Sequence, residues 1–157
     1  MKFVLLIIGK TNIDYIHSGV EEYLKRLKHY IPFEIKEIHG IKSSKKLNVF
    51  KQKEIEGKLI LKNLLSSDYM ILLDEKGKDF SSIQFSYFIE KITIKQNKNI
   101  VFVIGGAFGF SQDVYDRANE KISMSKMTFS HQFIRLIFVE QLYRAFTIIR
   151  GEPYHNQ

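Results

Sequence analysis

The sequence predicts an α/β fold with a mostly parallel sheet between helices. The first observation is a run of five apolar residues, Ile100–Ile104, which is followed directly by glycines. Such a run suits a strand that is buried on both faces, and these strands belong mostly to parallel sheets covered by helices. The second observation is that short apolar segments alternate with amphipathic helical segments along the chain. This alternation is typical of a parallel sheet with helices on its faces.

The first half of the chain predicts two strands and two helices. Ile16, Val20 and Tyr23 recur at helical spacing while charged residues lie between them, so a helix is expected there. The expected elements are, in order, a strand at Lys2–Gly9, a helix that ends near Tyr30, a strand at Phe33–Ile38, a basic loop at His39–Lys46 and a helix from about Leu47 or Asn48 to Leu65.

The second half predicts three strands and three helices. Ser81 or Ser82 can cap a helix, and so can Ser111, because a serine side chain accepts a hydrogen bond from the first helical turn. The expected elements are a strand at Tyr69–Asp74, a turn at Glu75–Asp79, a helix after the serines, the strand Ile100–Ile104, a short helix from Ser111 to about Ala118, a strand at Lys121–Ser125 and a helix at about Gln132–Ile149.

The last predicted helix is apolar on nearly its whole surface. Only Glu140, Arg144 and Thr147 form a narrow polar stripe, which indicates a helix buried almost all round. One face of a sheet covers only one side of a helix, and large exposed apolar surfaces usually mark partner sites. We therefore expect a homodimer; the alternative is a central helix within a monomer.

Length and composition restrict the class of protein. A chain of 157 residues fits one domain, which we expect to span residues 1–157. No apolar run approaches the roughly 20 residues that cross a bilayer, and the first apolar stretch is too short for a signal peptide. The absence of cysteine excludes disulfides and thiol chemistry. We expect a cytoplasmic protein with no membrane partner.

The net charge of +7 is unevenly distributed. Residues 1–63 hold 13 Lys or Arg against 7 Asp or Glu, so most of the excess lies in this part. Within Lys42–Lys53, five lysines occur with no acidic residue between them. This segment suits a phosphate backbone bound through salt-sensitive contacts, and the alternative is an ordinary solvated surface.

The glycines after Ile104 mark a candidate ligand site. Gly105, Gly106 and Gly109 permit positive φ and close backbone approach at the carboxyl end of a central strand, where open α/β sheets usually bind ligands. A tight turn without a ligand is the alternative reading. The first strand-to-helix turn holds one glycine and no phosphate-loop motif, which argues against dinucleotides and nucleoside triphosphates. The five histidines lack metal-ligand spacing, so no metal site is predicted.

Several separated motifs carry more specific information. They are Ile104–Gly109, Ser123–His131, Glu140–Ala145, Pro153-Tyr154-His155, Gly19-x-x-Glu22-Tyr23 and Pro32-Phe33-Glu34. In this order and spacing they closely resemble the SPOUT-class large-subunit ribosomal RNA methyltransferase H family over the whole chain. Ala107-Phe108 replaces a frequent Pro-Glu of that family, and Ser130 replaces a frequent proline; both departures concern the shapes of the loops and not the activity.

The resemblance implies both a fold and an activity. The implied fold has a trefoil knot near its carboxyl end, which no periodicity predicts and which general topology disfavours. The implied protein is a homodimer that uses S-adenosylmethionine as donor. The implied reaction methylates N3 of a pseudouridine in helix 69 of 23S ribosomal RNA, with the assembled ribosome as the expected partner. A noncatalytic RNA- or ribosome-binding protein is the alternative function.

The resemblance also implies which residues bind the cofactor. S-adenosylmethionine carries no phosphate, so its site needs backbone groups and apolar walls and no basic cradle. The residues carried over to cofactor binding are Leu73, Gly105, Gly106, Met124, Ser125, Lys126, Met127, Thr128 and Phe129.

Three residues near the carboxyl end are candidates for the chemistry. The N3 proton of pseudouridine must be lost, which a base or a nearby cation assists. We expect His155 to accept the proton or contact RNA, Tyr154 to stack on or position the base, and Arg144 to stabilise an anion or contact a phosphate. Alternatively, Arg144 pairs with Glu140 one turn earlier, and the tail is unstructured.

Overall fold

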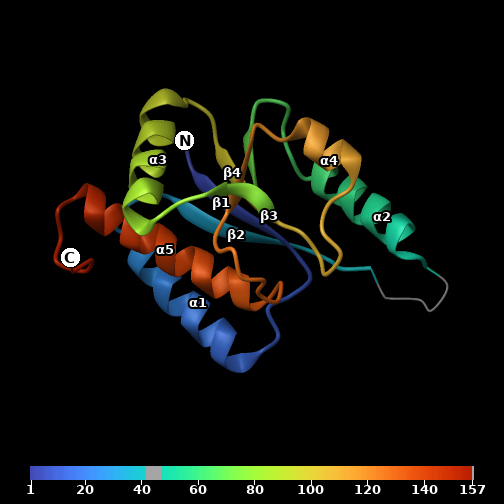
Figure 1. Ribbon diagram of the computed structural model, residues 1–157, viewed down its shortest axis with the longest axis horizontal. Helices are drawn as coiled ribbons and strands as arrows, with labels where there is room; N and C mark the ends of the chain where they lie inside the picture. The colour runs from blue at the N-terminus through green and yellow to red at the C-terminus, as the bar shows by residue number, and fades with distance from the viewer. Residues whose placement is uncertain (42–46, 157) are drawn as a thin grey trace.

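The computed structural model describes residues 1–41 and 47–156, and it shows a parallel five-stranded sheet between two layers of helices (Figure 1). The elements in chain order are β1 (Phe3–Ile8), α1 (Asp14–Leu27), β2 (Phe33–Ile38), α2 (Val49–Lys62), β3 (Tyr69–Asp79), α3 (Ser82–Lys95), β4 (Ile100–Ile104), α4 (Gln112–Arg117), β5 (Glu120–Ser123) and α5 (Phe133–Ile149).

The sheet has the strand order β2-β1-β4-β3-β5, and every neighbouring pair is parallel. The predicted α/β class is therefore confirmed. β4 lies at the centre, where β1 and β3 pair with its two edges and all five of its residues are buried. This burial on both faces explains why its sequence is uninterrupted by polar residues.

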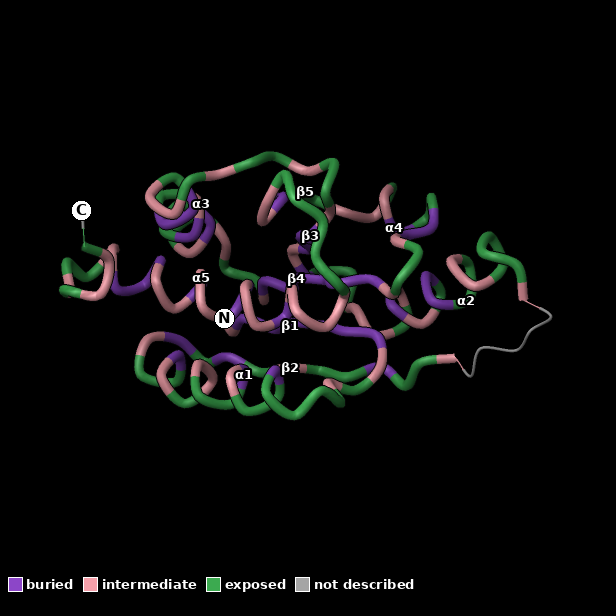
Figure 2. The backbone as a smooth tube through the Cα atoms, turned by 60° about the horizontal axis from the view of Figure 1, so that its bottom comes forward, coloured by how far each residue is buried: buried purple, intermediate pink, exposed green. Residues whose placement is uncertain are grey.

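Two separate cores form because successive strand residues point to opposite faces. In β1, Phe3, Leu5 and Ile7 belong to the core under α1, α3 and α5, whereas Val4 and Leu6 belong to the core under α2 and α4. Figure 2 shows the resulting band of buried backbone through the middle of the molecule. The helices α1 and α3 both pack on α5, so α5 lies between them.

Strand β3 differs from the prediction. The stretch Glu75–Asp79 continues the strand instead of forming a turn, and its pairing with β5 shifts register between Leu73 and Lys78. A Cβ atom at Gly77 would lie 2.5 Å from the carbonyl carbon of Ile122, so only glycine fits this close strand contact. Gly77, predicted as a turn residue, is therefore required by the backbone packing of β3 against β5.

The surroundings of α5 also change one expectation. As predicted, no residue of α5 is exposed: each one is buried or half-buried. However, α1 and α3 flank the helix, so part of the surface assigned to a second copy is covered within the chain. Half-buried apolar residues remain along the helix, including Phe133, Ile137 and Tyr143.

Within residues 1–41 and 47–156, the helices are all too short or too polar to span a membrane.

Candidate functional site

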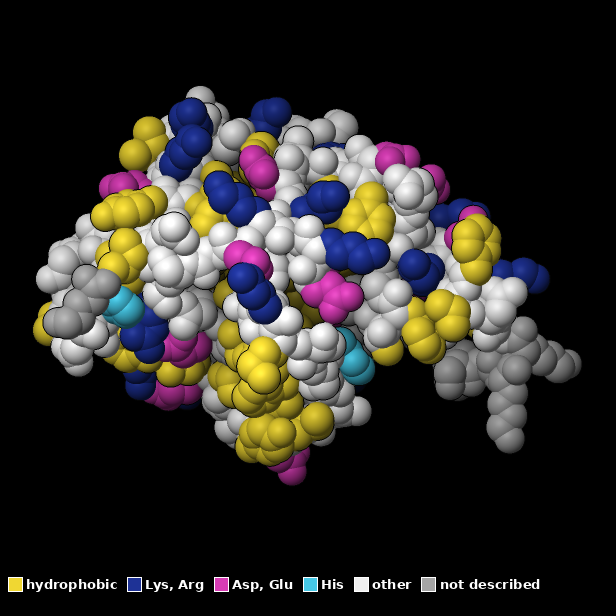
Figure 3. Space-filling model, in the orientation of Figure 1, with side chains coloured by type: hydrophobic (Ala, Val, Ile, Leu, Met, Phe, Trp, Pro, Cys, Tyr) yellow, Lys and Arg dark blue, Asp and Glu magenta, His cyan; other side chains and the backbone are white. Residues whose placement is uncertain are grey.

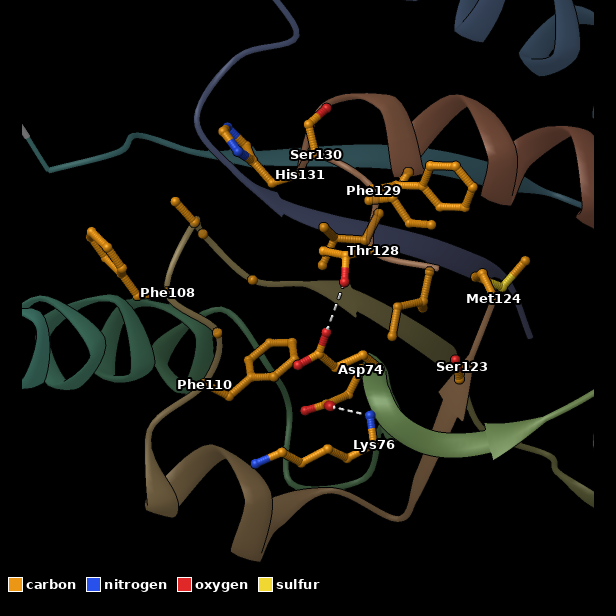
Figure 4. Close-up of a pocket in the computed structure, with 18 of the residues that line it drawn as sticks. Asp74, Lys76, Phe108, Phe110, Ser123, Met124, Thr128, Phe129, Ser130 and His131 are labelled. Atoms are coloured by element: carbon orange, nitrogen blue, oxygen red, sulfur yellow. Dashed lines mark hydrogen bonds between the residues drawn. The ribbon is translucent and has the colours of Figure 1, made fainter. Parts of the chain in front are cut away.

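A cavity of about 660 Å³ opens at the carboxyl end of β4, beside the middle of β3. Three segments far apart in the sequence build most of it: the middle of β3, the glycine loop after β4 (residues 105–110) and the loop between β5 and α5 (residues 124–132) (Figure 4). The sheet order explains this meeting, since β3 lies between β4 and β5. The position agrees with the usual ligand site of open parallel sheets.

The glycine loop is held by its own backbone and by packing. Gly109 has φ of 83° and donates its N–H to the carbonyl oxygen of Gly106 at 3.2 Å. Gly105 and Gly106 do not have positive φ, contrary to prediction. Both positions require glycine because of close packing. At Gly105 a Cβ atom would lie 3.0 Å from the Phe110 ring, and at Gly106 it would lie 2.5 Å from the Glu56 carboxylate. The close backbone approach that these two glycines permit is therefore to the side chains of Phe110 and Glu56.

Short-range hydrogen bonds shape the loop between β5 and α5. The Ser123 hydroxyl donates to the Ser125 carbonyl at 2.8 Å, and the Ser125 hydroxyl accepts from the Met127 N–H at 2.9 Å. Thr128 donates to Glu75 at 3.4 Å, which links this loop to β3 (Figure 4). These bonds hold the loop over the cavity while the Met127 side chain stays 76% exposed.

One wall of the cavity is polar. Asp74 and Tyr115 both line the cavity, and the Tyr115 hydroxyl donates a hydrogen bond to Asp74. Burial and this bond raise the pKa of Tyr115, so the phenol keeps its proton. Asp74 also accepts from the backbone N–H of Lys76 at 2.8 Å. Sequence reasoning missed these residues, although their signal was available: Asp74 directly follows the apolar run of β3.

Two further lining residues were also missed. Lys53 of α2 reaches the cavity, and His131 lines it from the loop before α5. Burial and the nearby Arg135 lower the pKa of His131. Of the lysine-rich segment, Lys42, Lys45 and Lys46 lie outside the described residues.

The residues predicted to bind the cofactor come together here, with one exception. Lys126 is not among the lining residues. Those that line the cavity are Leu73, Gly105, Gly106, Met124, Ser125, Met127, Thr128 and Phe129.

The three predicted catalytic residues lie elsewhere. Arg144, Tyr154 and His155 do not line the cavity, because α5 begins beside the cavity loop and they lie in its last turns and beyond it. An α-helix rises 1.5 Å per residue, so the 17 residues of α5 span about 25 Å. Figure 1 shows the carboxyl terminus beyond the far end of α5.

These residues form a cluster of their own around Glu140, which we call the tail cluster (Glu140, Arg144, Tyr154 and His155). Arg144 pairs with Glu140 at 2.5 Å, and its guanidinium lies 4.7 Å from the centre of the Tyr154 ring. The Tyr154 hydroxyl donates to Glu140 at 3.1 Å. Burial and hydrogen bonding to Tyr23 raise the pKa of Tyr154. The alternative pairing of Arg144 with Glu140 is thus present, and the tail is folded back on α5.

His155 is held by Arg144 in this cluster. Nη1 of Arg144 lies 3.2 Å from Nδ1 of His155. A guanidinium can only donate hydrogen bonds, so Nδ1 is the acceptor and the ring proton of neutral His155 is on Nε2. In this arrangement neither ring nitrogen is free to take a proton from a substrate.

No group of three or more His, Cys, Asp or Glu side chains within residues 1–41 and 47–156 is arranged to hold a metal ion.

Comparisons with known proteins identify the family of this chain. The family model described as "Predicted SPOUT methyltransferase" matches residues 1–155. Proteins named "Ribosomal RNA large subunit methyltransferase H" from Parabacteroides distasonis, Phocaeicola vulgatus and Christiangramia forsetii are 57%, 52% and 51% identical to this chain, and each alignment covers the whole of both chains. The chain therefore belongs to the SPOUT methyltransferase family.

Proposed function

We propose that this methyltransferase transfers a methyl group from S-adenosylmethionine to N3 of a pseudouridine in helix 69 of 23S ribosomal RNA. Its substrate would be the assembled ribosome in the cytoplasm. The names of the relatives support an RNA substrate. The resemblance of the sequence motifs to the methyltransferase H family supports the particular nucleotide.

The observation that carries this proposal is the cavity formed by Leu73, the glycine loop and the loop before α5. Its volume falls within the roughly 300–1,000 Å³ of small-molecule sites. Leu73, Ile104 and Met124 give it apolar walls, and Asp74 and Glu75 place carboxylates beside them. These residues fit S-adenosylmethionine, which has an adenine ring, a positive sulfonium and an amino group, and no phosphate.

The chain would contribute alignment and charge in the reaction. When bound, the cofactor supplies a methyl group on a positively charged sulfur. The cavity loops would hold this methyl group in line with the acceptor nitrogen, which is the main way a protein accelerates such a displacement. We propose that His155, once it exchanges its contact with Arg144, takes the N3 proton or contacts RNA, that Tyr154 positions the base, and that Arg144 stabilises the anion.

The separation of the tail cluster from the cavity favours a homodimer in which one protomer's tail serves its partner's cavity. In one chain, ten residues of α5, about 15 Å, separate the cavity residue Ile134 from Arg144. Figure 3 shows apolar side chains gathered on the surface below the cavity. Exposed apolar residues occur at the start of α1, at Ile13 and Tyr15, and before α5, at Met127 and Phe129. Such a surface suits a second copy.

Further parts of the proposal rest on the sequence: the trefoil knot on the family resemblance, the single domain on chain length, and the RNA contact on the lysine-rich composition. We propose that residues 1–157 act as one SPOUT domain and that its carboxyl end forms a trefoil knot. We also propose that Lys42–Lys53 contacts the RNA backbone; Lys53 supports this because it reaches the cavity.

Two measurements test the proposed function. Calorimetric titration of the purified protein with S-adenosylmethionine should release heat, whereas a noncatalytic RNA-binding protein would show no binding. Mass spectrometry of 23S ribosomal RNA from cells with and without the gene should show N3-methylpseudouridine only when the gene is present. An unchanged modification pattern would exclude this substrate.

A further inference from the structure

Glu56 of α2 is a buried carboxyl group outside the cavity. It is 5% exposed. Oε1 accepts a hydrogen bond from Nε2 of Gln52 at 3.2 Å, whereas Oε2 is buried without a hydrogen-bond partner. Burial raises the pKa of this carboxyl group, which the Gln52 bond opposes. An unpaired buried carboxyl oxygen is unfavourable for folding, so packing alone gives no reason for glutamate here.

The unpaired oxygen lies against the glycine loop. A Cβ atom at Gly106 would be 2.5 Å from Oε2 of Glu56, so the backbone of Gly106 lies directly on the carboxyl group. Gly106 also lines the cavity. Gly106 therefore lies between Glu56 and the cavity proposed to bind the cofactor.

The next residue of α2 holds the other end of the same loop. A Cβ atom at Gly57 would lie 2.2 Å from the Ser111 hydroxyl oxygen and 3.2 Å from Val114. Ser111 precedes the first residue of α4. The pair Glu56-Gly57 thus contacts the glycine loop where it leaves β4 and where it enters α4.

We propose that Glu56 is a positioning residue that, through Oε2 and Gly106, holds the glycine loop in the shape required for cofactor binding. Gly57 allows α2 to come close enough for this contact. The inference rests on the proposed cofactor, S-adenosylmethionine. Glu56 acts through the loop and does not touch the cofactor, because it does not line the cavity.

The first test compares Glu56→Ala with Glu56→Gln. Glu56→Ala removes the side chain against which Gly106 packs, so S-adenosylmethionine binding should weaken about tenfold, with little change in kcat at saturating cofactor. Glu56→Gln keeps the shape and one acceptor oxygen, so it should restore most of the affinity. Glu54→Gln is the matched control, because Glu54 is exposed on the same helix.

A double-mutant cycle separates positioning from packing. Gly106→Ala alone should disturb the fold, since its Cβ meets the Glu56 carboxyl group. Adding Glu56→Ala makes room for that methyl group, so the double variant should regain the wild-type melting temperature while its cofactor affinity stays about tenfold weaker. Full recovery of affinity in the double variant would show that any group filling this space serves as well, so the Glu56 carboxyl group would have no positioning role and the proposal would be overturned.

The outcomes distinguish this inference from the proposed function. If the wild-type protein binds S-adenosylmethionine and Glu56→Ala binds it equally well, the inference is wrong and the proposed function stands. If the wild-type protein gives no binding in the same titration, the proposed cofactor itself is wrong.

Discussion

The proposed chemistry needs two regions of this molecule, the cavity and the tail cluster. They differ in whether their polar groups face an open space or bond to one another. In the cavity, backbone and side chains from three segments surround an open space of about 660 Å³. In the tail cluster, Arg144 and Tyr154 both donate hydrogen bonds to Glu140, and Arg144 also bonds to His155. The cavity is thus preformed for a ligand, whereas the tail cluster must exchange its internal contacts before it can meet a substrate.

The largest effect should come from the tail cluster. His155→Ala should lower methyl transfer to ribosomes by about 10²–10⁴-fold if His155 takes the proton, and it should leave the affinity for S-adenosylmethionine unchanged. Single-turnover assays and calorimetry measure the two quantities. His17→Ala, at an exposed position of α1, is the control. Turnover near the wild-type value would remove His155 from the mechanism.

A mixed dimer tests whether the two regions act across subunits. One protomer would carry Gly106→Ala, which damages the cavity, and the other would carry His155→Ala. If the tail serves the partner's cavity, the purified heterodimer has one intact combined site and should show about half of the wild-type activity. Each homodimeric variant serves as a control. A heterodimer as inactive as both controls would show that each site is built from one chain.

Gly77→Ala should affect the cavity through the sheet. The new Cβ would lie 2.5 Å from the backbone of Ile122, so β3 and β5 must separate, at a cost of about 1–3 kcal/mol in the free energy of unfolding. Denaturant unfolding measures this change. Gly40→Ala is the control, since its Cβ would make only an ordinary 3.7 Å contact with Gly9. Equal stability of both variants would contradict the close strand contact.

The smallest effect concerns His131 at the edge of the cavity. Burial lowers its pKa below the ordinary 6.5, so the unfolded chain binds more protons than the folded one between the lowered pKa and about 6.5. Stability should therefore rise with pH through this window and level off above it. His131→Gln should flatten that rise in melting temperature, whereas His17→Gln should not. A slope that survives His131→Gln would assign it to another group.

Most of the fold could be predicted because the strands carry simple patterns. β1 and β4 are apolar throughout and are buried on both faces, as expected of central parallel strands. The extension of β3 past Asp74 could not be predicted, because it depends on Gly77 meeting Ile122, a contact between residues 45 positions apart. Local sequence there indicates a turn, and tertiary packing overrides it.

The site could be predicted only in part. The glycine loop was visible from its composition, and the loop before α5 came from the family resemblance. Glu56 could not be found, because nothing local shows that a helical glutamate faces a glycine 50 residues later. The separation of the tail cluster from the cavity likewise depends on the direction in which α5 crosses the sheet.

The length of α5 then affects catalysis directly. If two chains pair so that each tail reaches the other's cavity, the distance along this helix sets how far one subunit is displaced against the other. One added helical turn would shift the tail by about 5.4 Å, more than a displacement reaction tolerates, and would leave each cavity intact. Helix length, rather than any single side chain, would then determine whether donor and acceptor meet.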